Sequence, residues 1–260
     1  MSLIFAVVNQ KGGVGKTTTT VSLGAALAAR GQRTLLIDAD PQANATTALG
    51  QKQGESGGLY EALVDERPIE NAIVGTDVVG LWLVPTTPNL AGAEVELVSS
   101  MAREFRMKRI LDPLRERFDI ILIDCPPSLG LLTVNALSAA DEVIIPVQCE
   151  YLALEGLGHL SQTLRLVQAN LNPRLKIRGI VLTMFDGRTN LAKQVEDEVR
   201  KHFTNTFHSV IPRSVRLSEA PSHGTPIQLY DPRSPGAIAY EELADELLAQ
   251  LRAPARAAGT

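Results

Sequence analysis

The chain has little cysteine and few aromatic rings. Its 260 residues include 2 cysteines, and aromatic residues make up 4%. Two cysteines cannot build a disulfide scaffold, so the composition suits a reducing compartment. The scarcity of rings argues against RRM and OB folds, which stack nucleic-acid bases on aromatic platforms. We therefore expect a core built from Leu, Ile, Val and Ala.

Long apolar runs and a strong charge of one sign are also missing. No apolar run reaches the roughly 18 residues of a membrane-spanning helix. The first run, Leu3 to Val8, follows Met1 too closely for the basic segment of a signal peptide. The net charge of −4 excludes a polycation. These features predict a soluble, cytoplasmic protein in which any nucleic-acid binding is confined to a local surface.

Short apolar runs alternate with helical patterns along most of the chain. The runs are continuous, which is typical of parallel strands that helices cover on both faces. They predict strands at Leu3–Asn9, Thr34–Asp38, Leu81–Pro85, Ile120–Asp124, Val143–Val147, Ile180–Met184 and Val210–Ile211. The intervening patterns predict helices at Thr17–Arg30, Ala102–Arg117, Leu131–Ala139, Glu155–Ala169, Leu191–Phe203 and Pro235–Leu251. This order predicts an α/β fold with a doubly wound, mostly parallel sheet.

The domain organisation is simple. No linker, repeat or low-complexity tract divides the chain, so we expect one domain over residues 1–252. The glycine-rich stretch Gly50–Gly58 predicts an exposed loop after a short helix. The small residues from Ala253 to Thr260 predict a frayed tail.

A phosphate-binding loop is the strongest signal in the sequence. It follows the first predicted strand and opens the first predicted helix, which is the context that a P-loop requires. The glycines let backbone N–H groups point at one spot, to which the helix N-terminus adds positive charge. Lys16 can reach the β- and γ-phosphates of ATP, and the Thr17 hydroxyl can ligate Mg²⁺. The predicted nucleotide-binding residues are Lys11, Gly12, Gly13, Val14, Gly15, Lys16, Thr17 and Thr18.

Carboxylates follow two other predicted strands. Asp38 and Asp40 come at the end of one, and Asp124 ends the apolar run from Ile120 in the manner of a Walker B motif. Ligands of open α/β sheets bind at this edge. We expect Asp38 and Asp124 to serve Mg²⁺ and Asp40 to position the attacking water. The alternative for each acid is a turn or a helix N-cap.

The loop departs from the ordinary Walker A pattern, because Gln10 replaces its first glycine and Lys11 is an additional lysine. This form resembles the deviant Walker A ATPases, which include ParA/Soj partition proteins, MinD and the nitrogenase iron protein. Five further segments resemble chromosomal ParA/Soj proteins in particular: Leu36–Asn44, Leu122–Ser128, Pro146–Gly156, Thr183–Asn190 and Ile211–Gly224.

The resemblance implies a function and additional site residues. Lys11 would cross the interface of an ATP-dependent homodimer to the partner's nucleotide, which makes it catalytic together with Lys16 and Asp40. Gly12 would also lie at that interface. Met184 and Pro212 would line the adenine pocket. The implied function is an ATPase for partitioning a chromosome or plasmid. Its ATP-bound dimer binds double-stranded DNA without sequence preference, and a ParB-type centromere-binding protein stimulates hydrolysis to release it.

Three alternatives use the same loop. A MinD-type membrane ATPase needs a basic amphipathic C-terminal helix, whereas the segment from Tyr240 to Leu248 carries four acids. A redox role like that of the nitrogenase iron protein needs cluster cysteines, but Cys125 and Cys149 lack a glycine-rich setting and suit buried positions. A binding module that never hydrolyses ATP is disfavoured by Asp40.

Positive charge gathers late in the chain. Residues 174–216 carry nine basic residues against four acids, whereas the remainder carries sixteen against twenty-five. This asymmetry predicts a phosphate-binding face on an otherwise acidic protein. The candidate DNA-binding residues are Arg188, Lys193, Arg213 and Arg216. The alternative is an ordinary charged surface.

Overall fold

The structure is a computed structural model that describes residues 2–52, 58–150 and 153–252. Most of the predicted loop at 50–58, the predicted tail at 253–260 and residues 151 and 152 of the segment Pro146–Gly156 lie outside the described residues. Within the described ranges, no helix is both long enough and apolar enough to cross a bilayer.

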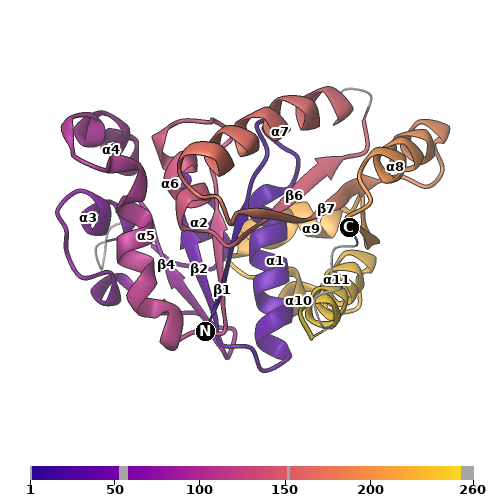
Figure 1. The fold of residues 1–260 in the computed structure, drawn as a ribbon. Helices are drawn as coiled ribbons and strands as arrows, with labels where there is room; N and C mark the ends of the chain where they lie inside the picture. The colour runs from indigo at the N-terminus through magenta and orange to yellow at the C-terminus, as the bar shows by residue number, and fades with distance from the viewer. Residues whose placement is uncertain (1, 53–57, 151–152, 253–260) are drawn as a thin grey trace.

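One sheet organises the described residues (Figure 1). Its strand order is β3-β4-β2-β5-β1-β6-β7-β8. All neighbours are parallel except β3 and β4. The strands are β1 (Leu3–Val7), β2 (Thr34–Asp38), β3 (Val74–Gly75), β4 (Leu81–Val84), β5 (Ile120–Asp124), β6 (Glu142–Gln148), β7 (Lys176–Phe185) and β8 (Thr206–Pro212). The predicted doubly wound α/β fold is confirmed.

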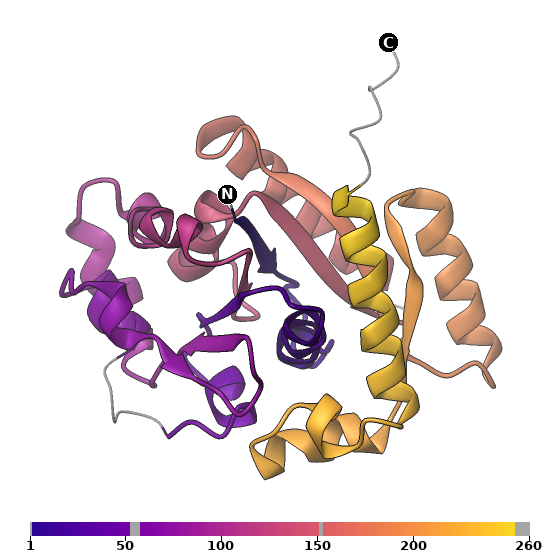
Figure 2. The same ribbon diagram turned by 90° about the horizontal axis from the view of Figure 1, so that it is seen from below.

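Helices cover both faces of the sheet (Figures 1 and 2). One face packs against α3 (Leu59–Leu63), α4 (Leu90–Glu96), α5 (Arg106–Leu111), α6 (Leu131–Ala139), α7 (Ala153–Asn170) and α8 (Asn190–His202). The other packs against α1 (Lys16–Ala29), α2 (Asn44–Ala48), α9 (Val215–Glu219), α10 (Ile227–Tyr230) and α11 (Pro235–Arg252). In β1, Ile4 and Ala6 face the first core, whereas Phe5 and Val7 face the second. Burial on both faces explains the continuous apolar runs.

Some predicted elements need correction. The helix predicted at Ala102–Arg117 is broken into 3₁₀ turns on either side of α5. Pro113 contributes to the break because it has no N–H to donate within a helix. The short elements β3, α3, α4, α9 and α10 were not predicted individually. Each has seven residues or fewer, which is too short to show a hydrophobic period. Strand β8 is longer than predicted, because exposed His208 interrupts the apolar pattern of this edge strand.

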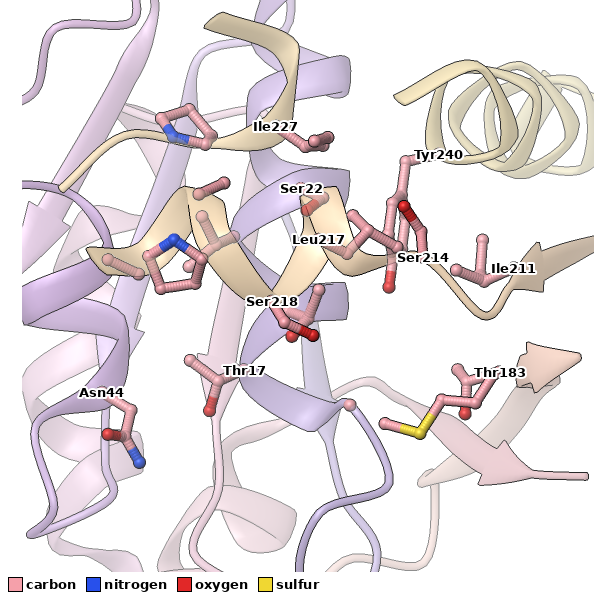
Figure 3. Close-up of a pocket in the computed structure, with 18 of the residues that line it drawn as sticks. Thr17, Ser22, Asn44, Thr183, Ile211, Ser214, Leu217, Ser218, Ile227 and Tyr240 are labelled. Carbon is pink, nitrogen blue, oxygen red and sulfur yellow. The ribbon is translucent and has the colours of Figure 1, made fainter. Parts of the chain in front are cut away.

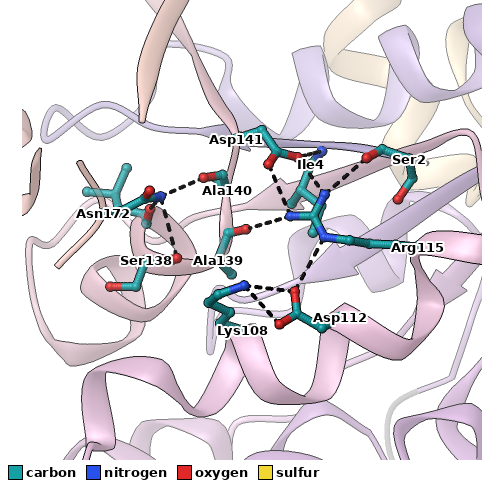
Figure 4. Close-up of polar contacts among 11 residues, drawn as sticks. Ser2, Ile4, Lys108, Asp112, Arg115, Ser138, Ala139, Ala140, Asp141 and Asn172 are labelled. Carbon is teal, nitrogen blue, oxygen red and sulfur yellow. Dashed lines mark hydrogen bonds and ion pairs between the residues drawn. The ribbon is translucent and has the colours of Figure 1, made fainter. Parts of the chain in front are cut away.

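A polar network closes the amino end of the sheet (Figure 4). The Arg115 guanidinium donates to Asp141 Oδ2 at 2.7 Å and to the Ser2 carbonyl at 3.0 Å. The same Asp141 oxygen accepts a bond from the Ile4 N–H at 2.9 Å. These groups satisfy one another and tie β1 to the start of β6. The polar residues predicted to bind ligands lie at the opposite, carboxyl edge.

Candidate phosphate-binding site

The loop between β1 and α1 has the geometry of an anion-binding turn. Gly13 and Gly15 have φ angles of 73° and 84°, which favour residues without a Cβ. Gly15 occupies the N-cap of α1 and leaves its first N–H groups without a side-chain cap. These N–H groups and the helix dipole favour an anion at this point. The predicted order of strand, glycine-rich turn and helix is confirmed.

Two polar side chains outside the motif hold the loop in place. Asn9 Nδ2 donates to the Pro146 carbonyl at 2.7 Å, and Asn9 Oδ1 accepts from the Lys11 N–H at 3.0 Å. Thr183 Oγ1 donates to the Val14 carbonyl at 2.8 Å. We did not predict either role from the sequence. A polar residue directly after an apolar strand is the only local signal for Asn9.

The two loop lysines occupy different environments. Lys16 is 7% exposed and donates from Nζ to the Lys11 carbonyl at 3.1 Å. The Lys11 side chain is 42% exposed, and its Nζ lies 3.3 Å from Glu150 Oε2. An exposed ion pair of this kind contributes about 0–1 kcal/mol. Lys11 can therefore exchange Glu150 for another anion at small cost, whereas Lys16 is confined to the loop.

The sheet places Asp124 next to the start of α1. Val7 and Asp38 are the register partners of Asp124 in the neighbouring strands. Asp124 is fully buried, and its Oδ2 accepts a 2.7 Å hydrogen bond from Thr17 Oγ1. The structure thus brings together the hydroxyl and the carboxylate that were predicted to serve Mg²⁺.

Asp38 and Asp40 have different partners. Asp38 is buried, and its Oδ2 accepts bonds from both the N–H and the Oγ1 of Thr46, each at 2.7 Å. These contacts favour a role in anchoring α2, so the metal role of Asp38 stays a prediction. Asp40 is 6% exposed and accepts from the Gln42 N–H at 3.0 Å.

The site contains more buried carboxyl groups than buried lysines. Burial, reinforced by the neighbouring Asp38, raises the pKa of Asp124. Burial lowers the pKa of Lys16, although Asp124 and Asp40 oppose that shift. A divalent cation would relieve the excess negative charge, and hydroxyl and carboxylate oxygens are ligands that suit Mg²⁺. No cluster of three or more His, Cys, Asp or Glu side chains among the described residues could hold a metal.

A cavity of about 410 Å³ opens beside the loop (Figure 3). Thr17 and Thr18 line it from α1, and Met184 and Pro212 line it from the ends of β7 and β8. The volume is within the usual range for small-molecule sites. The predicted adenine-pocket residues therefore lie in one cavity with the phosphate loop. Ser214, Ser218 and Tyr240 also line the cavity (Figure 3), and nothing in the sequence indicated this role for them.

The basic residues of segment 174–216 do not form one face. Arg174 and Lys176 lie at the amino end of β7, away from the cavity. Arg178 and Arg200 pair with Glu142 and Glu196. Arg188, Lys193, Arg213 and Arg216, which were predicted to bind DNA, are exposed basic residues of this segment that follow the carboxyl ends of β7 and β8, on the side of the cavity.

These four residues follow the carboxyl ends of β7 and β8. Arg188 is 88% exposed and pairs with Asp186 at 2.7 Å. Arg213 lies 3.8 Å from Glu150, and Arg216 lies 3.0 Å from Glu219. The candidate basic surface is therefore smaller than the sequence count suggested.

Comparisons with known proteins agree with this geometry. A family model described as an AAA domain matches residues 2–177. The chain is 57% identical to the sporulation initiation inhibitor protein Soj of Bacillus subtilis, over 96% of this chain and 99% of that protein. It is 56% identical to the chromosome partitioning protein ParA of Myxococcus xanthus, over 94% of this chain and 87% of that protein.

Solved structures share the whole fold. One is described as cobyrinic acid a,c-diamide synthase from Mycobacterium smegmatis with bound ADP and magnesium; its TM-score is 0.86 and its identity is 41%, over 97% of this chain and 96% of that one. Another is the cell division ATPase MinD of Pyrococcus furiosus, with a TM-score of 0.80 and an identity of 28%, over 96% of this chain and 100% of that one.

The parallel sheet, the glycine-rich loop and the Thr17–Asp124 pair define a P-loop ATPase. Among these ATPases, the chain is more than half identical in sequence to Soj and ParA over nearly its full length. The chain belongs to the ParA/Soj family of chromosome-partitioning ATPases.

Proposed function

We propose that this protein is an ATP-driven partitioning switch associated with the nucleoid in the cytoplasm. Mg²⁺–ATP drives formation of a sandwich homodimer, the dimer binds double-stranded DNA without sequence preference, and a ParB-type partner stimulates the hydrolysis that releases it. The observation that carries the proposal is the 2.7 Å hydrogen bond to buried Asp124 from Thr17, which lines the same cavity as Met184 and Pro212.

ATP-dependent DNA binding tests the proposal as a whole. A mobility assay on two unrelated duplexes should show binding to both with ATP and weak binding with ADP. Protein that ignores both duplexes but binds anionic vesicles would contradict it. The packing of α11 argues against that outcome, because Leu243, Ala244 and Leu247 are buried in the core and Glu241 and Asp245 pair with Arg30.

The chain's own groups support ATP binding. The N-terminus of α1 and Lys16 would bind the phosphates, Met184 and Pro212, which line the cavity, would contact the base, and Thr17 and Asp124 would hold Mg²⁺. Mg²⁺ supplies charge neutralisation at the phosphates when it is bound.

Asp40 is the proposed group that orients the attacking water. Asp40→Asn should leave nucleotide affinity near the wild-type value and slow hydrolysis at least tenfold, because the amide keeps the contact to the Gln42 N–H but loses the charge. Asp40→Ala should slow it similarly and hold the protein on DNA. Phosphate-release kinetics and nucleotide titration measure the two effects. Wild-type turnover in both variants would assign the water to another residue.

Dimerisation is proposed to bring Lys11 to the partner's nucleotide. Lys11 is exposed at the front of the loop and is paired with Glu150 at the surface. Gly12 is exposed next to it, and a Cβ built there meets nothing within 4 Å. A larger side chain at position 12 therefore fits in the single chain. In the proposed dimer, the second copy would pack against the loop and occupy that space.

Gly12→Val should therefore bind nucleotide and fail to dimerise. Light scattering with ATP should show a monomer where the wild-type protein shows a dimer. Gly75→Val is the matched control, because Gly75 also has open space around its Cβ position and lies in edge strand β3. Equal dimer fractions for Gly12→Val and wild type would reject the sandwich arrangement.

A further inference from the structure

Asp124 is held by a second threonine that no motif singles out. Thr20 Oγ1 lies 3.1 Å from Asp124 Oδ1, while Thr17 Oγ1 donates to Asp124 Oδ2 at 2.7 Å. Thr17 and Thr20 are three residues apart on α1, so they share a face of the helix. Thr20 and Asp124 are both fully buried. Each carboxylate oxygen therefore lies within hydrogen-bonding distance of a different threonine hydroxyl.

The two contacts have different tasks. A hydrogen bond at Oδ2 alone leaves the carboxylate able to rotate about its Cβ–Cγ bond. A second bond at Oδ1 fixes the plane of the carboxylate, as outer-shell hydrogen bonds do for metal ligands. We propose that Thr20 is a positioning residue for the Mg²⁺ site, which holds Asp124 so that Oδ2 stays directed at Thr17. This inference rests on the proposed function, since it concerns the same site.

A purely structural role makes a different prediction. Thr20 Oγ1 also lies 3.0 Å from the Lys16 carbonyl, and helical threonines commonly bond the carbonyl four residues earlier. If that bond were the whole role of the hydroxyl, its removal would alter stability and leave the Mg²⁺ requirement unchanged. The Mg²⁺ requirement is therefore the measurement that separates the two roles.

Thr19 provides a matched control on the same helix. It is also fully buried, and its hydroxyl lies 3.0 Å from the Tyr240 hydroxyl rather than near Asp124. Thr19→Val and Thr20→Val remove the same group from the same helix. Thr20→Ser restores the hydroxyl and serves as the rescue variant.

The experiment is a titration of a fluorescent ATP analogue, first in EDTA and then over a series of Mg²⁺ concentrations. Thr20→Val should bind the analogue in EDTA as the wild type does, but should need about tenfold more Mg²⁺ to reach half of the Mg²⁺-dependent change. Thr20→Ser should recover most of that difference, and Thr19→Val should show the wild-type Mg²⁺ requirement. Melting temperatures of all variants report on folding.

Two results would overturn the proposal. One is a wild-type Mg²⁺ requirement in folded Thr20→Val, and the other is an equal increase in Thr19→Val. Failure of the proposed function looks different: wild-type protein itself would bind no analogue at any Mg²⁺ concentration. That result would reject the Mg²⁺–ATP site and the role of Thr20 together.

Discussion

Lys16→Ala is expected to lower the affinity for ATP by at least about two orders of magnitude. Lys16 is almost fully buried in the loop, and the negative charges of Asp124 and Asp40 favour its charged form. In a complex, truncating one partner of a buried, hydrogen-bonded charge pair typically weakens binding by about 2–5 kcal/mol, because the other charge loses its compensation. The carboxylates would then repel the triphosphate that Lys16 should attract. Each 1.4 kcal/mol corresponds to about tenfold in affinity.

Isothermal titration with ATP and Mg²⁺ measures this loss, and circular dichroism checks the fold. Lys11→Ala is the matched control within the same loop. Its side chain is exposed and paired with Glu150 at the surface, so the variant should keep monomeric ATP binding within a few-fold of wild type. Wild-type affinity in Lys16→Ala would show that the loop has been assigned the wrong role.

Arg216→Glu is expected to abolish DNA binding in the ATP-bound state. The Arg216 guanidinium lies 3.0 Å from Glu219, 3.4 Å from Asp231 and 6.0 Å from the centre of the Tyr230 ring. These contacts hold an exposed cation in place at the surface. A guanidinium can bind phosphate oxygens in a fork without reading bases, which suits binding to any sequence.

The proposed dimer would present two copies of Arg216, so each substitution should remove two phosphate contacts. The slope of log K against log salt concentration is negative, and the loss of two contacts should reduce its magnitude by about two, at about 0.9 per phosphate. Arg216→Ala should show the smaller slope without added repulsion, and Arg188→Glu should have a weaker effect than Arg216→Glu. A salt series on two duplexes measures these slopes.

Arg67→Glu is the control for surface charge. Arg67 is also exposed and lies 3.7 Å from an acid, Asp65, but it follows α3 near the opposite edge of the sheet. This variant should bind DNA nearly as wild type does, apart from the general effect of net charge. Unchanged affinity and slope in Arg216→Glu and Arg188→Glu would exclude the basic surface proposed here.

Local patterns determined the scaffold of the site. The continuous apolar runs predicted β2 and β5 with their observed bounds, Thr34–Asp38 and Ile120–Asp124, because strands buried on both faces are apolar along most of their length. The turn at Gly13 and Gly15 could also be predicted from the sequence, because its positive φ angles favour glycine. In contrast, α5 and its flanking 3₁₀ turns were misread as one helix, because the apolar spacing continues across Pro113.

The amino-acid sequence by itself thus determined the α/β class, the phosphate loop, and the acids at strand ends. The tertiary structure alone decided which of these groups meet. It placed β5 between β2 and β1, which brought Asp124 to Thr17 and Thr20 more than a hundred residues away. It also turned Asp38 toward Thr46. Periodicity records only whether a residue is buried, whereas the partners of a buried polar group depend on the strand order and register, which bring distant segments together.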